Sequence, residues 1–256
     1  MEDYYSEFQN FDNFAKHTDS IVSSIKELDK ELREGGISLV DVGANDGLLT
    51  QKILQSLASR HPNIRVYVLE PDQASYSRLK KRFERDGKVQ TDNLGFQEWI
   101  ESYGAHLEGT VDLLLNSHTF YHFPRDDWQR IINDGYKIIR SDGRHAIIID
   151  SEKTSVNQLK QTLDKLIGKE RKTTAYGDVL FGRDLKEFFD SNGIRHEHRV
   201  INQPIVIPAN EDSLQNFGRV LGFIFRYNPR DILRYGSEPV QEFMKQYLSG
   251  ENYSFP

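Results

Sequence analysis

The stretch from Val40 to Gly47, which reads Val-Asp-Val-Gly-Ala-Asn-Asp-Gly, constrains the fold of this chain more than any other. A β-branched run typical of a buried strand ends at an acid and at Gly43, and a helical apolar pattern begins just after Gly47. A second apolar run, residues 64–70, follows after one helix length and ends in Glu70. This order predicts a strand–helix–strand unit with a ligand over the carboxyl ends of its strands.

The same alternation continues along the chain. The expected strands cover residues 37–42, 64–70, 88–91, 111–117 and 144–150. The expected helices cover residues 4–33, 48–60, 73–85 and 126–140. Because these strands are apolar on both faces, the pattern predicts an α/β fold, with a parallel sheet covered by helices on both sides.

The pattern changes after residue 150. It predicts a late strand over residues 195–207 and helices over residues 155–167, 183–191, 211–227 and 238–248. The interval 150–182 is longer than an ordinary crossover, which indicates a cap insertion that lies partly over the active site. We therefore expect an N-terminal helical segment, residues 1–36, followed by a main domain, residues 37–256, that contains this cap.

Composition excludes several kinds of function. The chain has no cysteine, so disulfides, zinc ribbons and cysteine nucleophiles are excluded. A net charge of -6 without a long basic stripe argues against a nucleic-acid partner. The basic cluster in residues 78–85 is interrupted by Leu79 and Phe83 at helical spacing, which predicts that its cations form the solvated face of a helix.

The sequence has no apolar run long enough for a membrane span and no secretory signal, so we expect a cytoplasmic protein.

The spacing of the glycines favours one kind of nucleoside cofactor. A dinucleotide fingerprint reads Gly-x-Gly-x-x-Gly. Here Asn45 occupies the position two residues after Gly43, where that fingerprint has its second glycine, and the next glycine is Gly47. This wider turn suits a ligand without phosphate, such as adenosine that carries a methionine arm. Asp41 can take up an ammonium group, and Glu70 can accept both ribose hydroxyls. Glu70 would serve the ribose of NAD equally well.

Taken in order, these motifs resemble those of class I S-adenosylmethionine-dependent methyltransferases. They are Asp41-Val-Gly-Ala-Asn-Asp-Gly47, Leu69-Glu70-Pro71, Leu113-Leu114-Leu115-Asn116-Ser117-His118 and Ser141-Asp142-Gly143. The resemblance implies a Rossmann-like sheet, S-adenosylmethionine as cofactor, adenine contacts after the third strand and a sulfonium beside the end of the fourth. The residues it assigns to the cofactor are Asp41, Gly43, Asn45, Gly47, Glu70, Pro71, Gln73, Phe96, Gln97 and Ser117.

A narrower resemblance to the histamine N-methyltransferase group extends outside the sheet. It rests on Tyr4-Tyr5-x-x-Phe8-x-x-Phe11, on residues 70–73 and on Thr119-Phe120-Tyr121-His122. It implies a small-molecule acceptor, most simply an amine or amino-acid nitrogen, under an N-terminal helical lid, residues 1–36. The acceptor contacts carried over from the group are Tyr4, Phe8, His17 or Asp19, and Tyr121.

The chain departs from that group in two places. The group's tryptophan pair after the fifth strand is replaced by Asn157 and Leu159, which argues against histamine itself. The sequence stops at Tyr253-Ser254-Phe255-Pro256 without the apolar run that would form the group's final strand. Either the sheet lacks that strand or the sequence is a piece of a longer chain.

Two histidines are candidates for catalysis. An amine must lose a proton before its lone pair can attack, and a histidine is suited to accept that proton near neutral pH. His118 and His122 follow the fourth expected strand, and His118 is the first choice. Alternatively, both are polar residues at the rim of the pocket. His145 is expected to be structural, and no pair of histidines has the context of a metal site, so we expect no metal.

Other functions stay open at this point. An O-methyltransferase acting on a carboxylate or phenol would need no base at His118 when the acceptor is a carboxylate. A methyltransferase acting on a protein side chain, an NAD-binding oxidoreductase and a binding module without activity are further alternatives. The sequence does not predict the oligomeric state.

Overall fold

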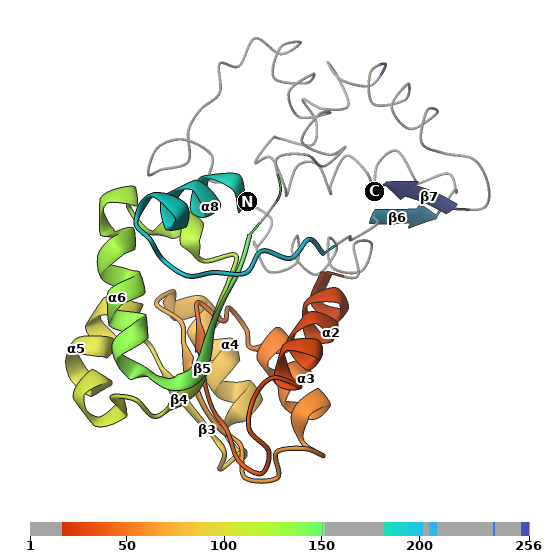
Figure 1. Cartoon of the computed structure of the whole chain (residues 1–256). Coiled ribbons are helices and arrows are strands. Elements are labelled where there is room, and N and C mark those ends of the chain that lie inside the picture. Colours follow the sequence, from red (N-terminus) through yellow and green to blue (C-terminus); the bar gives the residue numbers. More distant parts are fainter. Residues whose placement is uncertain are drawn as a thin grey trace. The chain divides into compact units, whose positions relative to one another are not determined.

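The computed structural model of the chain describes residues 17–149, 151, 182–201, 205–208, 238 and 252–255. The chain divides into two compact units (Figure 1), and residues 21–150 with residues 173–185 form the unit that contains the main sheet. Within the described residues, no helix has the length and apolar character needed to cross a membrane.

The main sheet has five parallel strands in the order β3-β2-β1-β4-β5. The strands are β1 (Ser38–Val42), β2 (Arg65–Leu69), β3 (Val89–Asp92), β4 (Val111–Ser117) and β5 (Ile139–Ile148). The chain builds outward from β1 to β3 and then returns to add β4 on the other side of β1. The strand order therefore reverses between β1 and β4, which is where ligands of open α/β sheets bind, outside the carboxyl ends of the strands.

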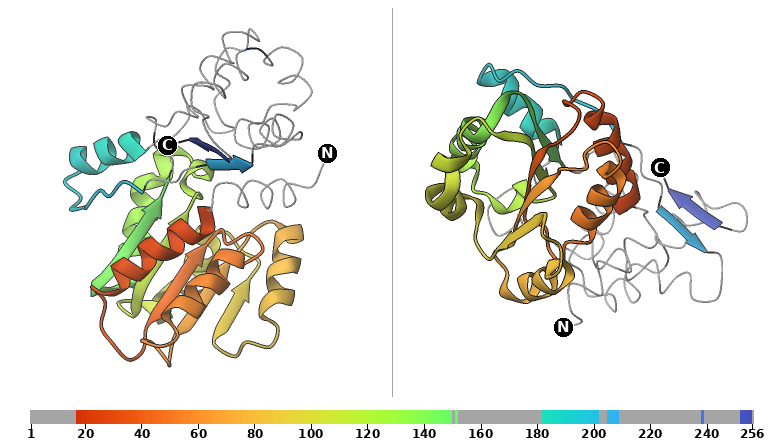
Figure 2. Two further views of the ribbon diagram at one scale, coloured as in Figure 1. Left: turned by 90° about the vertical axis from the view of Figure 1, so that its right-hand side faces the viewer. Right: turned by 90° about the horizontal axis from the view of Figure 1, so that it is seen from below.

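Helices cover both faces of this sheet, as predicted. The helices that pack on the sheet are α2 (His17–Asp29), of which residues 21–29 belong to the sheet unit, α3 (Leu48–Leu57), α4 (Gln73–Phe83), α5 (Phe96–Leu107) and α6 (Trp128–Ile138). In Figure 1, α5 and α6 lie on one side of the strands and α2 and α3 on the other, and the right-hand view of Figure 2 shows the same separation.

Successive side chains along each strand point to opposite faces of the sheet, and this alternation determines which strand residues contact which helices. One cluster of buried side chains joins a single face of the sheet to α2, α3 and α4, and it includes Ile21, Ile25, Leu39, Ile53, Leu57, Val66, Leu79 and Leu113. The neighbouring strand residues point to the opposite face. There the Tyr67 ring meets Trp99 of α5 at 5.8 Å between centroids, and Leu114 packs under Gly135 of α6.

The boundaries of several elements differ from those expected. The sequence pattern predicts no helix over α5. The motif at residues 141–143, which resembles a turn before the fifth strand, lies inside β5 where the register with β4 is irregular. The helix α8 (Gly182–Ser191) agrees with its prediction. Of the late strand predicted over residues 195–207, residues 195–201 are not a strand and β6 (Ile205–Pro208) covers only the end.

β6 pairs antiparallel with β7 (Asn252–Phe255) in a separate two-stranded sheet. In the described part of the chain, β5 is the last strand on its side of the main sheet. The helices predicted over residues 155–167, 211–227 and 238–248 and most of the cap, residues 150–182, lie outside the described residues.

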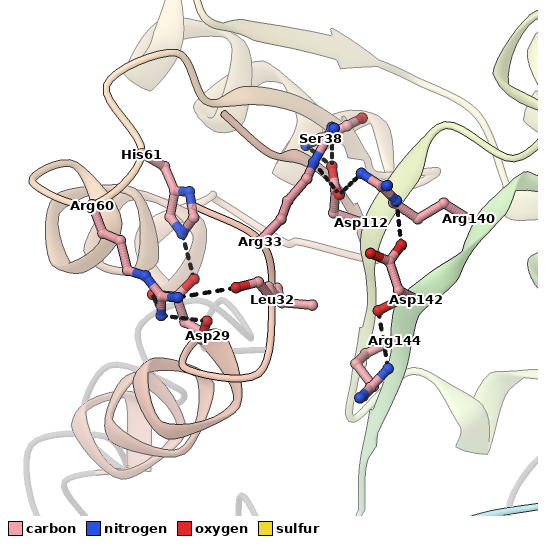
Figure 3. Close-up of polar contacts among 10 residues, drawn as sticks. All are labelled: Asp29, Leu32, Arg33, Ser38, Arg60, His61, Asp112, Arg140, Asp142 and Arg144. Atoms are coloured by element: carbon pink, nitrogen blue, oxygen red, sulfur yellow. Dashed lines mark hydrogen bonds and ion pairs between the residues drawn. The ribbon is translucent and has the colours of Figure 1, made fainter. Parts of the chain in front are cut away.

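At the amino ends of the strands, one buried carboxylate joins three segments (Figure 3). Asp112 in β4 is 1% exposed and accepts a hydrogen bond from the backbone N–H of Ser38 at 2.8 Å. It also pairs with Arg33 Nε at 2.9 Å and with Arg140 Nη1 at 3.0 Å. This carboxylate therefore holds the segment before β1 and the start of β5 against β4.

A second buried carboxylate holds the end of α2. Asp29 contacts His61 Nε2 at 2.5 Å and Arg60 Nη1 at 3.2 Å, and Arg60 also donates to the Leu32 carbonyl at 3.0 Å (Figure 3). These bonds tie the last turn of α2 to the segment that follows α3. Residues 21–36 of the expected N-terminal segment belong to the sheet unit and are fixed within it by these bonds, whereas the role of the segment as a lid stays a prediction.

We expect Asp112→Asn to lower the free energy of unfolding by about 2 kcal/mol, because the amide keeps an acceptor for Ser38 but loses the charge-assisted bonds to Arg33 and Arg140. Chemical denaturation measures this change. Asp126→Asn, at an exposed position, is the matched control and should stay within about 0.5 kcal/mol of the parent chain. Equal unfolding free energies for the two variants would contradict the role of Asp112.

Candidate functional site

The loop between β1 and α3, residues 43–47, bends across the end of β2. Gly43, Asn45 and Gly47 all have left-handed backbone, with φ of 71°, 54° and 77°. The backbone N–H groups of Gly43 and Ala44 both donate to the Leu69 carbonyl, at 2.8 and 3.0 Å. We call this segment the cofactor loop.

Gly47 is required by packing as well as by backbone conformation. A Cβ at this position would lie 2.6 Å from Leu79 Cδ1 and 2.6 Å from Phe83 Cε2. The glycine therefore lets α4 pack directly against the end of the loop.

Glu70 follows β2 and is bound to the cofactor loop. Its Oε2 accepts the backbone N–H of Asn45 at 2.7 Å, and its Oε1 accepts that of Asp72 at 2.8 Å. Burial raises the pKa of Glu70, and these two backbone hydrogen bonds oppose the rise. Each carboxylate oxygen keeps a second lone pair, so Glu70 can still accept ribose hydroxyls. Asn45 Oδ1, in the same loop, is buried without a hydrogen-bond partner among the described residues.

Asp41 in β1 is the second acid near this loop. It is 1% exposed and accepts a hydrogen bond from Thr50 Oγ1 at 2.5 Å. Burial raises its pKa to about 6; the Thr50 hydrogen bond opposes this rise and the charge of Glu70 adds to it. Two carboxyl groups held in this way favour a ligand with positive charge, and they would repel a pyrophosphate. This arrangement fits a sulfonium nucleoside with an amino group.

The other predicted cofactor residues lie at the ends of neighbouring strands. Pro71 and Gln73 are exposed on either side of Asp72, which caps α4 by accepting the Ser75 backbone N–H at 2.8 Å. That hydrogen bond lowers the pKa of Asp72. Ser117 is the last residue of β4 and is half-buried.

The segment after β3 holds the segment after β2. Asn93 Nδ2 donates to the Glu70 carbonyl at 2.7 Å and to the Pro71 carbonyl at 3.1 Å. Of the two residues predicted to contact adenine, Phe96 is 2% exposed and belongs to the core. Gln97 is half-buried in the first turn of α5, so it is the more accessible of the two.

The segment after β4, residues 118–121, carries the first-choice catalytic residue, and we call it the acceptor loop. His118 has left-handed backbone with φ of 54°, and its N–H donates to the Ile148 carbonyl at 2.9 Å. His118 Nδ1 lies 3.2 Å from Tyr121 Oη, and the two rings stack at 5.9 Å between centroids. His122, the second choice, is exposed.

The predicted acceptor contacts outside this loop are described only in part. His17 is buried and Asp19 is exposed in the first turn of α2. Both belong to the unit of the chain that does not contain the main sheet. Tyr4 and Phe8 lie outside the described residues. The role of these four residues stays a prediction.

Arg82 is a site residue that the sequence pattern does not predict. Its Nε donates to the Asp46 carbonyl at 2.7 Å, its Nη2 pairs with Asp46 Oδ2 at 2.5 Å, and its Nη1 donates to Gln51 at 2.9 Å. The prediction that the basic cluster forms only a solvated face is therefore wrong for Arg82, whose side chain is 22% exposed. The missed signal is its spacing, because residue 82 follows Leu79 by three and lies on the same helical face.

His145, which is expected to be structural, contacts the side chain of a β4 residue. Burial lowers its pKa to about 4, and its Nε2 lies 2.8 Å from Asn116 Oδ1. In the part of the chain that the structure describes, no group of three or more His, Asp or Glu side chains could hold a metal ion.

Comparison with known proteins assigns the central part of the chain. Residues 40–145, from β1 into β5, match the family model described as a methyltransferase domain. The sequence matches none of the curated proteins with which it was compared.

Solved structures with the same fold are methyltransferases. A SAM-dependent methyltransferase from Archaeoglobus fulgidus has a TM-score of 0.50 at 11% identity, with 99% of this chain and 98% of that chain covered. A candidate sarcosine dimethylglycine methyltransferase from Galdieria sulphuraria has a TM-score of 0.50 at 12% identity, with 93% and 84% covered. The DszA carbon methyltransferase has a TM-score of 0.52 at 15% identity, with 75% of this chain and 48% of that chain covered.

The sheet is that of a class I methyltransferase, as predicted. Residues 40–145 match a methyltransferase domain, and the expectations of an enzyme and of S-adenosylmethionine as its cofactor are confirmed. The narrower resemblance to the histamine N-methyltransferase group stays a prediction.

Affinity for the cofactor product S-adenosylhomocysteine should depend on pH through Asp41. Because the ionised carboxylate favours the ligand's ammonium group, binding should be constant well above pH 6 and weaken as pH falls, by about tenfold at pH 5 for a pKa near 6. Calorimetric titration from pH 5 to 8 measures this. Asp41→Asn should lose most of the dependence, and an identical pH profile in the two proteins would refute this role.

We expect Arg82→Met to weaken S-adenosylhomocysteine binding by about tenfold and to lower the free energy of unfolding by about 2–4 kcal/mol, because Asp46 stays buried without its cation. Titration and denaturation measure the two effects. Arg85→Met is the control, since the Arg85 side chain is 93% exposed. Indistinguishable Arg82 and Arg85 variants would show that Arg82 does not hold the loop.

Proposed function

We propose that this methyltransferase transfers the methyl group of S-adenosylmethionine to a nitrogen of a small amine or amino acid, with His118 as the general base. One observation supports this above the others. His118 lies at the end of β4, beside the point where strand order reverses, and its ring is oriented by the hydroxyl of Tyr121. That is where a base for an acceptor near the methyl group would be needed.

The proposal assigns His118 the tautomer in which Nδ1 carries the proton and faces Tyr121 Oη. When Nδ1–H donates to Tyr121 Oη, the lone pair of a neutral imidazole lies on Nε2. Nε2 can then take a proton from an ammonium group and leave the amine nucleophilic. Tyr121 therefore acts in this proposal by selecting the tautomer and orientation of His118.

The remaining residues bind and align. When bound, the cofactor supplies an electrophilic methyl group on a sulfonium. Glu70 and Asn45 offer acceptors for its ribose and amino groups, and Asp41 stabilises positive charge from beneath the loop. Tyr4 and Phe8 are the proposed aromatic cover of the acceptor.

The choice of substrates to test follows from this chemistry. The Galdieria sulphuraria neighbour is named for sarcosine and dimethylglycine, which are amines with a carboxylate. Likeness of fold does not transfer a substrate to this chain, so these compounds form one part of a panel that also contains simple amines, carboxylates and phenols.

Methylated products of this panel, detected by mass spectrometry, test the proposal directly. For an amine acceptor, His118→Gln should lower kcat/KM by about 10²-fold to 10³-fold, because proton removal is lost while the side chain stays polar. Its affinity for S-adenosylhomocysteine should stay within about twofold. His198→Gln, at an exposed position, is the matched control.

Two results would overturn the proposal. Methylation of a carboxylate or phenol alone, with no amine product, would favour an O-methyltransferase. Full amine methylation by His118→Gln would remove the general-base role, and His122→Gln would then be the next variant to measure.

A further inference from the structure

Thr119 connects the acceptor loop to the cofactor loop by direct packing. It is 7% exposed and lies directly after His118. A Cβ built on Gly43 would lie 2.3 Å from Thr119 Cγ2 and 3.4 Å from Thr119 Cβ, and these are the atoms it meets within 4 Å among the described residues outside its chain neighbours. The methyl group of Thr119 therefore occupies the space that a side chain at position 43 would need.

Hydrogen bonds fix the direction in which this methyl group points. Asn116 Nδ2 donates to Thr119 Oγ1 at 3.0 Å, and His145 Nε2 lies 2.8 Å from Asn116 Oδ1. Asn116 is 1% exposed. Burial keeps His145 neutral near pH 7, because its pKa is lowered to about 4, so Nε2–H can donate to the amide oxygen. With its hydroxyl held by Asn116, Thr119 has its methyl group directed at Gly43.

We propose that Thr119 is a positioning residue that sets the distance between the cofactor loop and the acceptor loop, through the contact of its methyl group with Gly43. The proposal rests on the function proposed for these two loops. A bound donor and His118 must be aligned for an in-line transfer, and a small displacement between loops lowers the rate steeply. One methyl group against one glycine is a contact that cannot shorten, so it fixes the closest approach of the two loops.

A double-mutant cycle that changes the side-chain size at positions 43 and 119 tests the contact between them. Gly43→Ala should weaken S-adenosylhomocysteine binding at least tenfold, because the new methyl group would overlap Thr119 Cγ2. Thr119→Ser removes that atom and keeps the hydroxyl, and it should weaken binding by about fourfold, the value of one buried methyl group. In the double variant the new Cβ lies 3.4 Å from the Cβ of residue 119, so the overlap is gone.

We expect the double variant to bind S-adenosylhomocysteine at least fivefold tighter than Gly43→Ala alone. The backbone strain of alanine at positive φ is common to both proteins and cancels in this comparison. Equal affinity of these two proteins, measured by calorimetry, would overturn the proposal.

Thr119→Val keeps the methyl group that faces Gly43 and removes the hydroxyl. Its affinity for S-adenosylhomocysteine should stay within about twofold of the parent chain, in contrast to Thr119→Ser. If both variants change only the melting temperature and neither changes this affinity, Thr119 is merely structural and the proposal fails. The comparison of Thr119→Ser with Thr119→Val tests the role of the Thr119 methyl group even if Gly43→Ala does not fold.

The cycle uses the cofactor product alone and needs no acceptor. Absence of methyl transfer to every amine of the panel would therefore refute the proposed function while the cycle still decides the role of Thr119. Conversely, amine methylation together with an additive cycle would support the function and refute the positioning role.

Discussion

The hydrogen bonds between the cofactor loop and the end of β2 are the contact on which the site depends. The Leu69 carbonyl accepts two backbone N–H groups of this loop, and the Glu70 carboxylate accepts a third, from Asn45. Because β1 and β2 are adjacent parallel strands, their carboxyl ends meet at this point. The loop is therefore shaped by the same residues that are expected to bind the cofactor ribose.

Charges at the two ends of the sheet are arranged differently. At the amino ends, Asp112 and Asp29 are both paired with arginines, which fixes the segments around α2 and β1. At the carboxyl ends, Asp41 and Glu70 are buried near each other and have raised pKa values. The first arrangement stabilises the fold, whereas the second leaves negative charge that a cationic ligand can neutralise.

Much of the sheet and part of the site could be predicted from local patterns. The apolar run over β4 and the glutamate after β2 have short-range signals, and both were found where the periodicity indicates them. The pattern does not predict α5 because its N-cap is Gly95, which offers no side-chain cap, although Phe96, Trp99 and Leu107 have helical spacing. The motif at residues 141–143, which resembles the turn before a fifth strand, lies within β5 at an irregularity, because the register with β4 passes from Val111–Ile139 to Leu113–Arg144 and skips these polar residues.

Residue order and spacing along the chain are sufficient to indicate a parallel sheet, a glycine turn and a nucleoside-binding acid, because each depends on neighbours within about one strand–helix–strand unit. Arg82 with Asp46, and Thr119 with Gly43, are separated by 36 and 76 positions and meet through packing of α4 and of the segment after β4 against one loop. No local periodicity encodes such contacts. They follow from the crossover connections that bring the carboxyl ends of separate strands together.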